Sequence, residues 1–380
     1  MTTNNNHASF NLSQVKRIVV KVGTSLIAPH TGIDEETIAH LSHDIVTLKK
    51  ADKEVLLVSS GAVGAGLTKL GLTMRPKTLP ELQAAASIGQ AALMHTYEKI
   101  FAETNNLVAQ VLLTHDDLQN RKRYLNAKAT LEQLLAWGIV PIINENDVVV
   151  SDEIRFGDND TLAALVVNLV VADLLVILTD QEGLYTADPR LDSQALLVQE
   201  ALATDPKLKG MAGGPGHAFS RGGMLTKILA AERAARSGAR TIICSGKTKN
   251  VLSLLLLENR PMGTLLQAHL PLQAARKRWL ADQLKPKGKV WVDRGAELAL
   301  QSGASLLPVG VHKIEGQFER GDLIVCVNDD HQEIGRGLTN YSAEEARRII
   351  GKSSHKIIEI LGYSEGEELI HRDNFTLLSS

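Results

Sequence analysis

The chain is poor in cysteine, in aromatic residues and in net charge. Its 380 residues include only two cysteines, Cys244 and Cys326, which excludes a disulfide framework and a four-thiolate metal site. Both lie in apolar runs, so we expect buried thiols. Aromatic residues make up 4%, so the core must be built from aliphatic side chains. A formal net charge of −2 argues against a general binder of polyanions.

One segment alone, residues 162–180, is long and apolar enough to imitate a membrane span. Asn168 and Asp173 interrupt it, and a charge at mid-span is costly in lipid. A buried helix followed by a buried strand, with the break at Asp173, explains the segment better. The polar start lacks the apolar stretch of a signal peptide. We therefore expect a cytoplasmic protein without membrane contact and a flexible N-terminus, residues 1–14.

Short apolar runs alternate with helical patterns from Val15 onward. Nearly continuous apolar runs predict parallel strands that are covered on both faces. The runs are residues 17–22, 54–59, 107–113, 139–144, 174–179 and 240–244. Between these runs lie two segments, residues 79–101 and 121–137, in which apolar residues recur at helical spacing. This order predicts an α/β fold with an open, mainly parallel sheet sandwiched by helices.

The pattern changes after about Pro261, where short strands separated by glycine predict a second, small and mostly β domain. We expect a catalytic domain over residues 15–260 and a linker over 261–286. The small domain then covers residues 287–372, and a C-terminal tail covers 373–380.

The usual nucleotide-binding motifs are missing. No GxxxxGK[ST] occurs, and the run GAVGAG at residues 61–66 has its glycines in the wrong order for GxGxxG. The run nevertheless follows a predicted strand and opens a helix, a junction that directs backbone N–H groups at an anion. Close packing of a small-residue helix accounts for the glycines equally well, and both alternatives stay open.

Charged, amide and hydroxyl side chains follow the predicted strands or begin the next helix, at the edge where open parallel sheets bind ligands. They are Lys21, Ser60, residues 144–147, Asp158, Asn159, Asp160, Thr179 and Asp180. Singly, Lys21 could be a surface lysine and Asp160 a helix cap. Their convergence favours a binding site, with the loop SRGGMLTK at residues 220–227 as a further glycine-rich junction.

This inventory suits phosphoryl transfer, whose catalysis is mostly positioning and charge neutralisation. The sequence has no HExxH motif and no spacing typical of a Ser/His/Asp or Cys/His nucleophile. If the acceptor is a carboxylate, it is already ionised at neutral pH, so no general base is needed. Lysines and a helix N-terminus would then offset the repulsion between the two anions.

The segments KVGTS, VSSGAVGAG, INENDVV, FGDNDTLAA, LTDQEGLYTADPR and GGMLTK resemble motifs of the amino-acid-kinase family. Within it they are most similar to the kinases that phosphorylate the side-chain carboxylate of L-glutamate, the first step of proline biosynthesis. Residues 288–372 are similar to a PUA domain. The resemblance implies the amino-acid-kinase fold, ATP and Mg²⁺, a homo-oligomer, and inhibition by proline. Hand-over of the product to the next enzyme of that pathway stays open.

The resemblance also implies roles for the matching residues. Lys21 and Lys227 would hold the transferring phosphate, and Asp160 would orient both lysines. Glutamate would bind at Ser60, Asp147, Asp158 and Asn159. ATP would bind at Lys21, Gly23, Gly61, Thr179, Asp180, Arg221, Gly222, Gly223, Met224 and Lys227. Arg221 departs from the family, which often reads GTGGM where this chain reads SRGGM. No protein ligand for a metal ion is implied.

Two other functions stay open. PUA modules of other proteins bind RNA, but residues 271–380 carry 15 Lys and Arg against 16 Asp and Glu. Because phosphate-driven binding needs a concentrated basic face, we expect no RNA binding. An aspartate or N-acetylglutamate kinase would use the same lysines, and residues 144–160 would then distinguish the acceptor.

Overall fold

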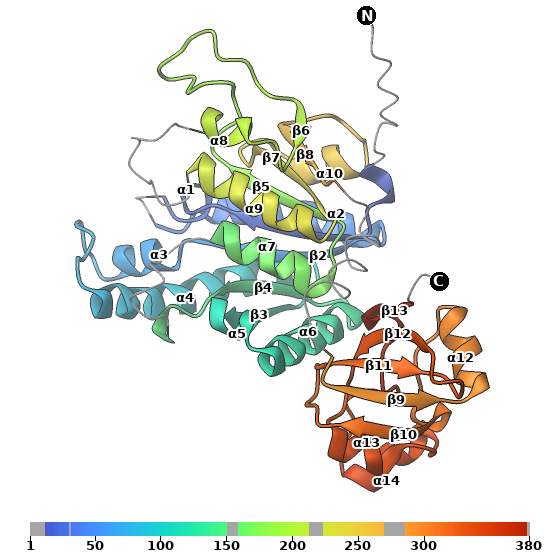
Figure 1. Ribbon diagram of the computed structural model, residues 1–380. Coiled ribbons are helices and arrows are strands. Elements are labelled where there is room, and N and C mark those ends of the chain that lie inside the picture. Colours follow the sequence, from blue (N-terminus) through green and yellow to red (C-terminus); the bar gives the residue numbers. More distant parts are fainter. Residues whose placement is uncertain (1–11, 30–31, 150–158, 213–222, 270–285, 378–380) are drawn as a thin grey trace, which may run out of the picture. The chain divides into compact units, whose positions relative to one another are not determined.

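The computed structural model describes residues 12–29, 32–149, 159–212, 223–269 and 286–377. The chain divides into two compact units, residues 1–119 with 126–272 and residues 120–125 with 273–380. The larger unit is an α/β fold, and the smaller one is mostly β (Figure 1).

An eight-stranded sheet forms the centre of the larger unit, in the order β3-β4-β2-β1-β5-β7-β8-β6. All neighbouring strands are parallel except β7 and β8. The strands are β1 Arg17–Val22, β2 Glu54–Ser59, β3 Val108–Leu113, β4 Val140–Glu145, β5 Leu174–Thr179, β6 Glu200–Leu202, β7 Arg240–Ser245 and β8 Thr264–Gln267. The predicted sheet is therefore confirmed as mainly parallel.

Helices cover both faces of this sheet. They are α1 Thr24–Ile27, α2 Glu35–Lys50, α3 Ala62–Lys69, α4 Leu79–Ala102, α5 His115–Gln119, α6 Arg121–Ala136, α7 Asn159–Val170, α8 Lys207–Met211, α9 Met224–Arg236 and α10 Val251–Leu256. The 3-10 turns η1 Leu12–Gln14 and η2 Asp147–Val149 complete the unit. One face packs on α2, α4 and α10 through a single apolar core. Helices α7 and α9 lie side by side and pack against the strands (Figure 1).

Alternation along each strand decides which helices a side chain meets. In β1, Ile18, Val20 and Val22 belong to the core with α2 and α4. Lys21 alternates with them and therefore points to the opposite face, toward α7 and α9. Asn144 at the end of β4 has the same parity as Ile142, which belongs to the α2–α4 core. The end of the sheet thus presents polar groups on both faces.

Two expectations about local structure have definite outcomes. The apolar segment 162–180 is a helix that ends at Val170 followed by β5, so the expected break is confirmed. Among the described residues no helix could span a membrane. The expectation that every strand is covered on both faces is wrong for β3, because it is an edge strand with several partly exposed residues.

Helices α3 and α4 approach each other closely through two glycines. A Cβ at Gly66 would lie 1.8 Å from the carbonyl oxygen of Ala85, and one at Gly89 would lie 1.8 Å from that of Ala62. Within the run GAVGAG, close packing of two helices therefore accounts for Gly66. Gly61 has a φ of +104° at the start of α3, a conformation that favours glycine.

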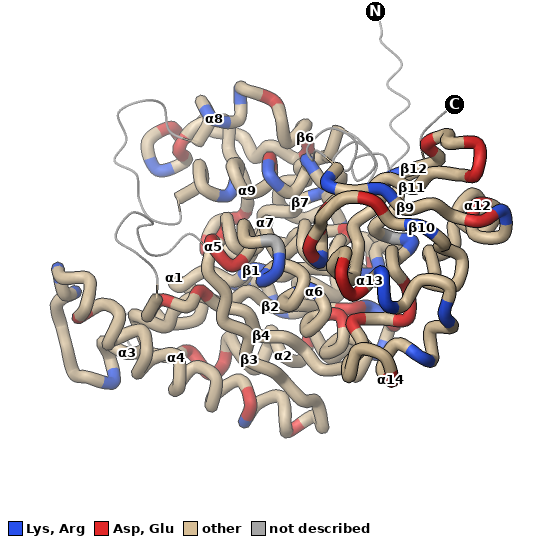
Figure 2. Tube along the Cα trace, turned by 60° about the horizontal axis from the view of Figure 1, so that its bottom comes forward, with Lys and Arg blue, Asp and Glu red and all other residues tan. Residues whose placement is uncertain are grey.

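The smaller unit contains a five-stranded sheet in the order β10-β9-β11-β12-β13. Its strands are β9 Gly288–Val292, β10 Val311–Gly316, β11 Leu323–Val327, β12 Glu333–Leu338 and β13 Phe375–Leu377. Its helices are α12 Arg294–Gln301, α13 Ala343–Ile349 and α14 Ile357–Leu361, with the 3-10 turns η3 Pro308–Gly310, η4 Ser354–Lys356 and η5 Arg372–Asn374. Figure 2 shows acidic and basic residues interspersed over this unit.

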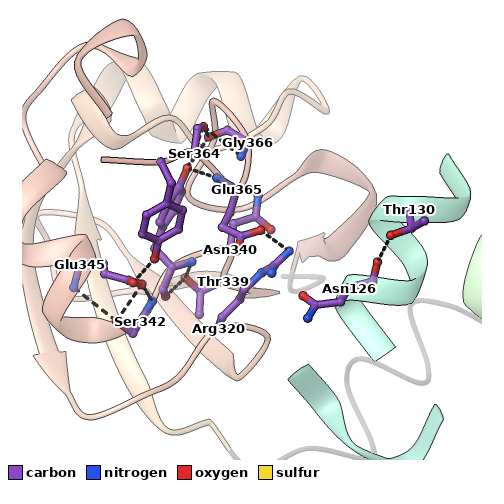
Figure 3. A network of polar contacts seen from close by, with 12 residues as sticks. Asn126, Thr130, Arg320, Thr339, Asn340, Ser342, Glu345, Ser364, Glu365 and Gly366 are labelled. Carbon is purple, nitrogen blue, oxygen red and sulfur yellow. Dashed lines mark hydrogen bonds and ion pairs between the residues drawn. The ribbon is translucent and has the colours of Figure 1, made fainter. Parts of the chain in front are cut away.

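Polar contacts fix the helix that covers this small sheet. Ser342 and Glu345 form a capping box at the start of α13, in which the N–H of Ser342 donates to Glu345 Oε2 at 2.8 Å (Figure 3). Nearby, Arg320 pairs with Glu365 at 2.6 Å. Cys244 in β7 and Cys326 in β11 are both buried, as expected from the apolar runs around them.

Replacing Gly89 by alanine should force α3 and α4 apart, because the new Cβ would overlap the backbone of α3. We expect Gly89→Ala to lower the free energy of unfolding by about 1–3 kcal/mol, measured by thermal or urea denaturation. Gly210→Ala in α8 is the control, because no atom lies within 4 Å of its added Cβ. Equal stability of the two variants would contradict the close packing.

Candidate active site

Two lysines from distant parts of the chain meet on one buried carboxylate. Lys21 Nζ lies 2.7 Å from Asp160 Oδ1, and Lys227 Nζ lies 3.2 Å from Asp160 Oδ2. The exposed fractions are 5% for Lys21, 4% for Lys227 and 1% for Asp160. Strand β1 supplies the first lysine, the first turn of α7 the carboxylate, and α9 the second lysine. The structure therefore brings together the three residues for which we expected a catalytic role.

Asp160 is held in its ionised form. Burial raises the pKa of its carboxyl, but the charges of Lys21 and Lys227, with hydrogen bonds from Lys21 and Thr226, outweigh burial and lower the pKa to about 2. Thr226 Oγ1 donates to Asp160 Oδ2 at 2.7 Å. At neutral pH the site therefore presents one carboxylate that fixes two ammonium groups.

Asn159, which begins α7, lies in a second cluster of polar side chains. Its Nδ2 is within 3.0 Å of Ser60 Oγ and Asn144 Oδ1, and 2.9 Å from the carbonyl oxygen of Ser59. Two of the residues that we expected to bind the acceptor, Ser60 and Asn159, thus touch each other. Because Asn159 directly precedes Asp160, the first turn of α7 joins this cluster to the lysines.

Asp147 begins the turn η2 that follows β4. Burial and, to a smaller extent, the charge of Glu145 raise the pKa of Asp147 to about 7. A carboxyl with this pKa is easily ionised by a nearby cation, so Asp147 is suited to an ammonium group. Within the described residues, Asp147 makes no hydrogen bond to Ser60 or Asn159.

The residues expected at the nucleotide lie at neighbouring strand ends and at the start of α9. Thr179 is buried and donates through Oγ1 to Asp180 Oδ1 at 3.1 Å, while Asp180 is exposed. Gly223 and Met224 begin α9, one turn before Lys227. The N–H groups at this helix start are available to an anion.

The protein's own contacts constrain two glycines of the expected ATP site. The N–H of Gly23 donates to the carbonyl of Leu178 at 3.2 Å, so the expected phosphate contact requires a ligand to displace this carbonyl. Gly61 lies at the end of β2 in a left-handed conformation, and a Cβ there would approach Ala28 to 2.9 Å. Three expected site residues, Asp158, Arg221 and Gly222, lie outside the described residues.

Two residues of the site escaped sequence reasoning. Nothing in the sequence indicates a role for Thr226 in the site, except that it directly precedes Lys227. Gln90 contacts Asn144, whose Nδ2 donates to Gln90 Oε1 at 2.7 Å. A signal existed, because Gln90 is polar and falls between Ala86 and Leu93 on the apolar side of the predicted helix 79–101.

The described residues contain no group of three or more His, Cys, Asp or Glu side chains that could hold a metal ion. The carboxylate nearest to the lysines, Asp160, is engaged by both of them.

Comparison with known proteins identifies the family. The profile described as amino acid kinase family matches residues 16–245. The chain belongs to the amino acid kinase family. A PUA domain profile matches residues 288–361.

Curated relatives cover almost the whole chain. A glutamate 5-kinase from Nitrosospira multiformis is 55% identical over 97% of this chain and 99% of its own length. One from Pseudomonas putida is also 55% identical, over 96% of this chain and 98% of its own. One from Stutzerimonas stutzeri is 53% identical over 97% of this chain and 99% of its own. This member of the family is therefore similar to these enzymes in both of its units.

Replacing Asp160 by asparagine should strongly destabilise the fold, because two buried ammonium groups lose their carboxylate. We expect Asp160→Asn to cost about 3–5 kcal/mol in the free energy of unfolding, measured by urea denaturation at pH 7. In the wild type this contribution is present above pH 3.8 and is lost as the pH falls toward about 2.

The matched control is Glu35→Gln, which removes a carboxylate from an exposed pair with Lys99. Such surface pairs contribute about 0–1 kcal/mol. An Asp160→Asn variant as stable as the Glu35→Gln variant would contradict the proposed importance of the buried cluster.

Proposed function

We propose that the chain is a glutamate 5-kinase. It transfers the γ-phosphoryl group of ATP to the side-chain carboxylate of L-glutamate and forms L-glutamyl 5-phosphate and ADP, the first step of proline biosynthesis. The convergence of Lys21 and Lys227 on Asp160 is the observation that carries the proposal. The names of the relatives support the choice of glutamate as the acceptor.

The two lysines would provide most of the catalysis. An oxygen of the glutamate carboxylate forms a bond to the γ-phosphorus while the bond to the leaving ADP oxygen breaks. The acceptor is already an anion, so charge repulsion is the main difficulty. A lysine about 4 Å from a phosphate oxygen contributes about 4 kcal/mol at an effective dielectric constant of about 20. Asp160 holds both ammonium groups in place, so little free energy is needed to orient them as the phosphoryl group is transferred.

Mg²⁺ would accompany the nucleotide. Because the described residues offer no carboxylate cluster, we expect the ion to be held by the phosphates of ATP and by water. When bound, it offsets part of the phosphate charge. The protein groups proposed for ATP are Lys21, Gly23, Gly61, Thr179, Asp180, Gly223, Met224 and Lys227.

The acceptor would bind beside the strand ends of β2 and β4. Ser60 and Asn159 form one side of this site, and Asp147 would pair with the α-ammonium group. Proline, which has the same ammonium and α-carboxylate groups, would inhibit by binding at or beside this site. A homo-oligomer and hand-over of the product to the next enzyme are further parts of the proposal, and we expect no RNA binding by the smaller unit.

Acceptor specificity tests the proposal directly. With ATP and Mg²⁺, L-glutamate should support ADP release and hydroxamate trapping of the acyl phosphate, whereas aspartate and N-acetylglutamate should support little of either. Lys21→Ala should reduce kcat by at least about 10²-fold, because one charged contact to the phosphoryl group is lost. The exposed Lys50→Ala variant is the control and should keep wild-type activity. Higher activity with aspartate would overturn the choice of substrate.

The raised pKa of Asp147 predicts a pH-dependent affinity for glutamate. Below about pH 7 the carboxyl is neutral and cannot pair with the ammonium group. The apparent KM for glutamate should therefore fall about tenfold from pH 6 to pH 8, as the ionised fraction rises. The KM for ATP should not follow this profile.

Asp147→Asn removes the titrating group and leaves the neighbouring backbone in place. Its KM for glutamate should be high and nearly independent of pH. A wild-type profile without this slope, or a variant that retains it, would exclude Asp147 as the ammonium-binding group.

A further inference from the structure

Gln90 is a buried glutamine on the apolar side of a long helix. It lies in α4, is 9% exposed, and its neighbours at helical spacing, Ala86 and Leu93, belong to the core. Buried glutamines are rare because a carboxamide needs several hydrogen-bond partners. The position of Gln90 therefore calls for an explanation in terms of its contacts.

Three carboxamides form a chain from this helix to the acceptor site. Asn144 Nδ2 donates to Gln90 Oε1 at 2.7 Å, and Asn159 Nδ2 donates to Asn144 Oδ1 at 3.0 Å. The two bonds join α4 to the end of β4 and to the first turn of α7. Gln90 thus touches Asn144, which touches the proposed acceptor residue Asn159.

Backbone groups fix the direction of two of these carboxamides, those of Asn144 and Asn159. The N–H of Glu145 donates to Asn144 Oδ1 at 2.9 Å, so Asn144 must turn its Nδ2 toward Gln90. The carbonyl of Ser59 accepts from Asn159 Nδ2 at 2.9 Å, so Asn159 must turn its Oδ1 away from the chain. A flipped carboxamide at either position would place two donors or two acceptors face to face.

Among the described residues, the two ends of this series of carboxamides find no partner. Asn159 Oδ1 and Gln90 Nε2 are both buried and accept or donate no hydrogen bond within that part of the protein. An unsatisfied buried polar atom costs free energy, so a residue chosen for stability alone would be apolar at Gln90. The cost indicates that Gln90 serves the site, through the one bond that its Oε1 accepts.

We propose that Gln90 is a positioning residue for the acceptor. By accepting from Asn144 Nδ2, it holds the Asn144 carboxamide in one orientation, and Asn144 in turn holds Asn159 with Oδ1 directed at the ligand. A fixed acceptor oxygen at this position selects a ligand with an N–H donor, such as the ammonium group of an amino acid. This inference rests on the proposed function, since it assigns the ligand of Asn159 to the acceptor.

Helix α4 also contacts Ser59, whose carbonyl accepts a hydrogen bond from Asn159. The hydroxyl of Tyr97, two turns after Gln90, lies 2.9 Å from Ser59 Oγ. Ser59 provides the carbonyl that orients Asn159, and Gly89 packs α4 against α3, which begins next to Ser60. The same helix therefore contacts two of the three residues that bond to Asn159, namely Ser59 and Asn144.

Steady-state kinetics of three variants test the role of Gln90. Gln90→Met has nearly the same length and removes the acceptor for Asn144. Gln90→Glu keeps that acceptor and removes Nε2. Gln133→Met makes the same replacement at an exposed position of α6. KM for glutamate, KM for ATP, kcat and the melting temperature are measured for each.

We expect Gln90→Met to raise the KM for glutamate about tenfold or more, because Asn144 is free to reorient. Its kcat and KM for ATP should stay within about twofold of the wild type, since the lysine cluster is untouched. Gln90→Glu should restore a KM near that of the wild type, and Gln133→Met should change none of these values. Should Gln90→Met fail to fold, Gln90→Asn, which withdraws the amide by one methylene, must show the same rise.

Three results would overturn the inference. An unchanged KM for glutamate in Gln90→Met would show that Asn144 needs no partner in α4. A parallel loss of kcat, of ATP affinity and of melting temperature would show a purely structural role. A large rise in KM for Gln90→Glu as well would indicate that Nε2 itself contacts the substrate. Failure of the proposed function is recognised separately, because the wild type would then show no glutamate-dependent ADP release.

Discussion

The pairing of two lysines with one buried aspartate is the constraint on which the larger unit depends. Lys21, Asp160 and Lys227 come from β1, α7 and α9, so the ion pairs fix the strand and both helices relative to one another. A charge that is removed from water must be paired, and breaking such a pair costs more than the pair gains. The fold around these elements is therefore tied to the cluster for which we propose a catalytic role.

Alternation along the strands divides the polar groups between the two faces of the sheet. Lys21 points toward α7 and α9, whereas Ser59 and Asn144 point toward α4, where they meet Tyr97 and Gln90. The first turn of α7 connects the two groups, because Asn159 bonds to the second and Asp160 to the first. Two adjacent residues thus place the proposed acceptor site next to the lysines that we propose to bind the phosphoryl group.

Much of this architecture follows from the sequence. The bounds of β1, β2 and β5 are predicted to the residue, because each is a largely apolar run that is flanked on both sides by a polar residue or glycine. The strands β6 and β8 are too short for an apolar pattern to predict them. The lysine cluster was inferred from family resemblance, since no local pattern links Lys227 to Lys21. The amide chain was missed, because its direction is set by backbone groups of Ser59 and Glu145, far from Gln90 in sequence.

The two cysteines give the molecule a built-in pair of probes. Cys244 lies in the larger unit and Cys326 in the smaller one, and both are buried. Burial, with a smaller effect of Glu182, raises the pKa of Cys244 to about 12, and burial raises the pKa of Cys326 as well. Since thiolates are the species that alkylating reagents attack, neither sulfur reacts until its own unit opens. The rate at which each thiol is labelled thus reports the opening of one unit independently of the other.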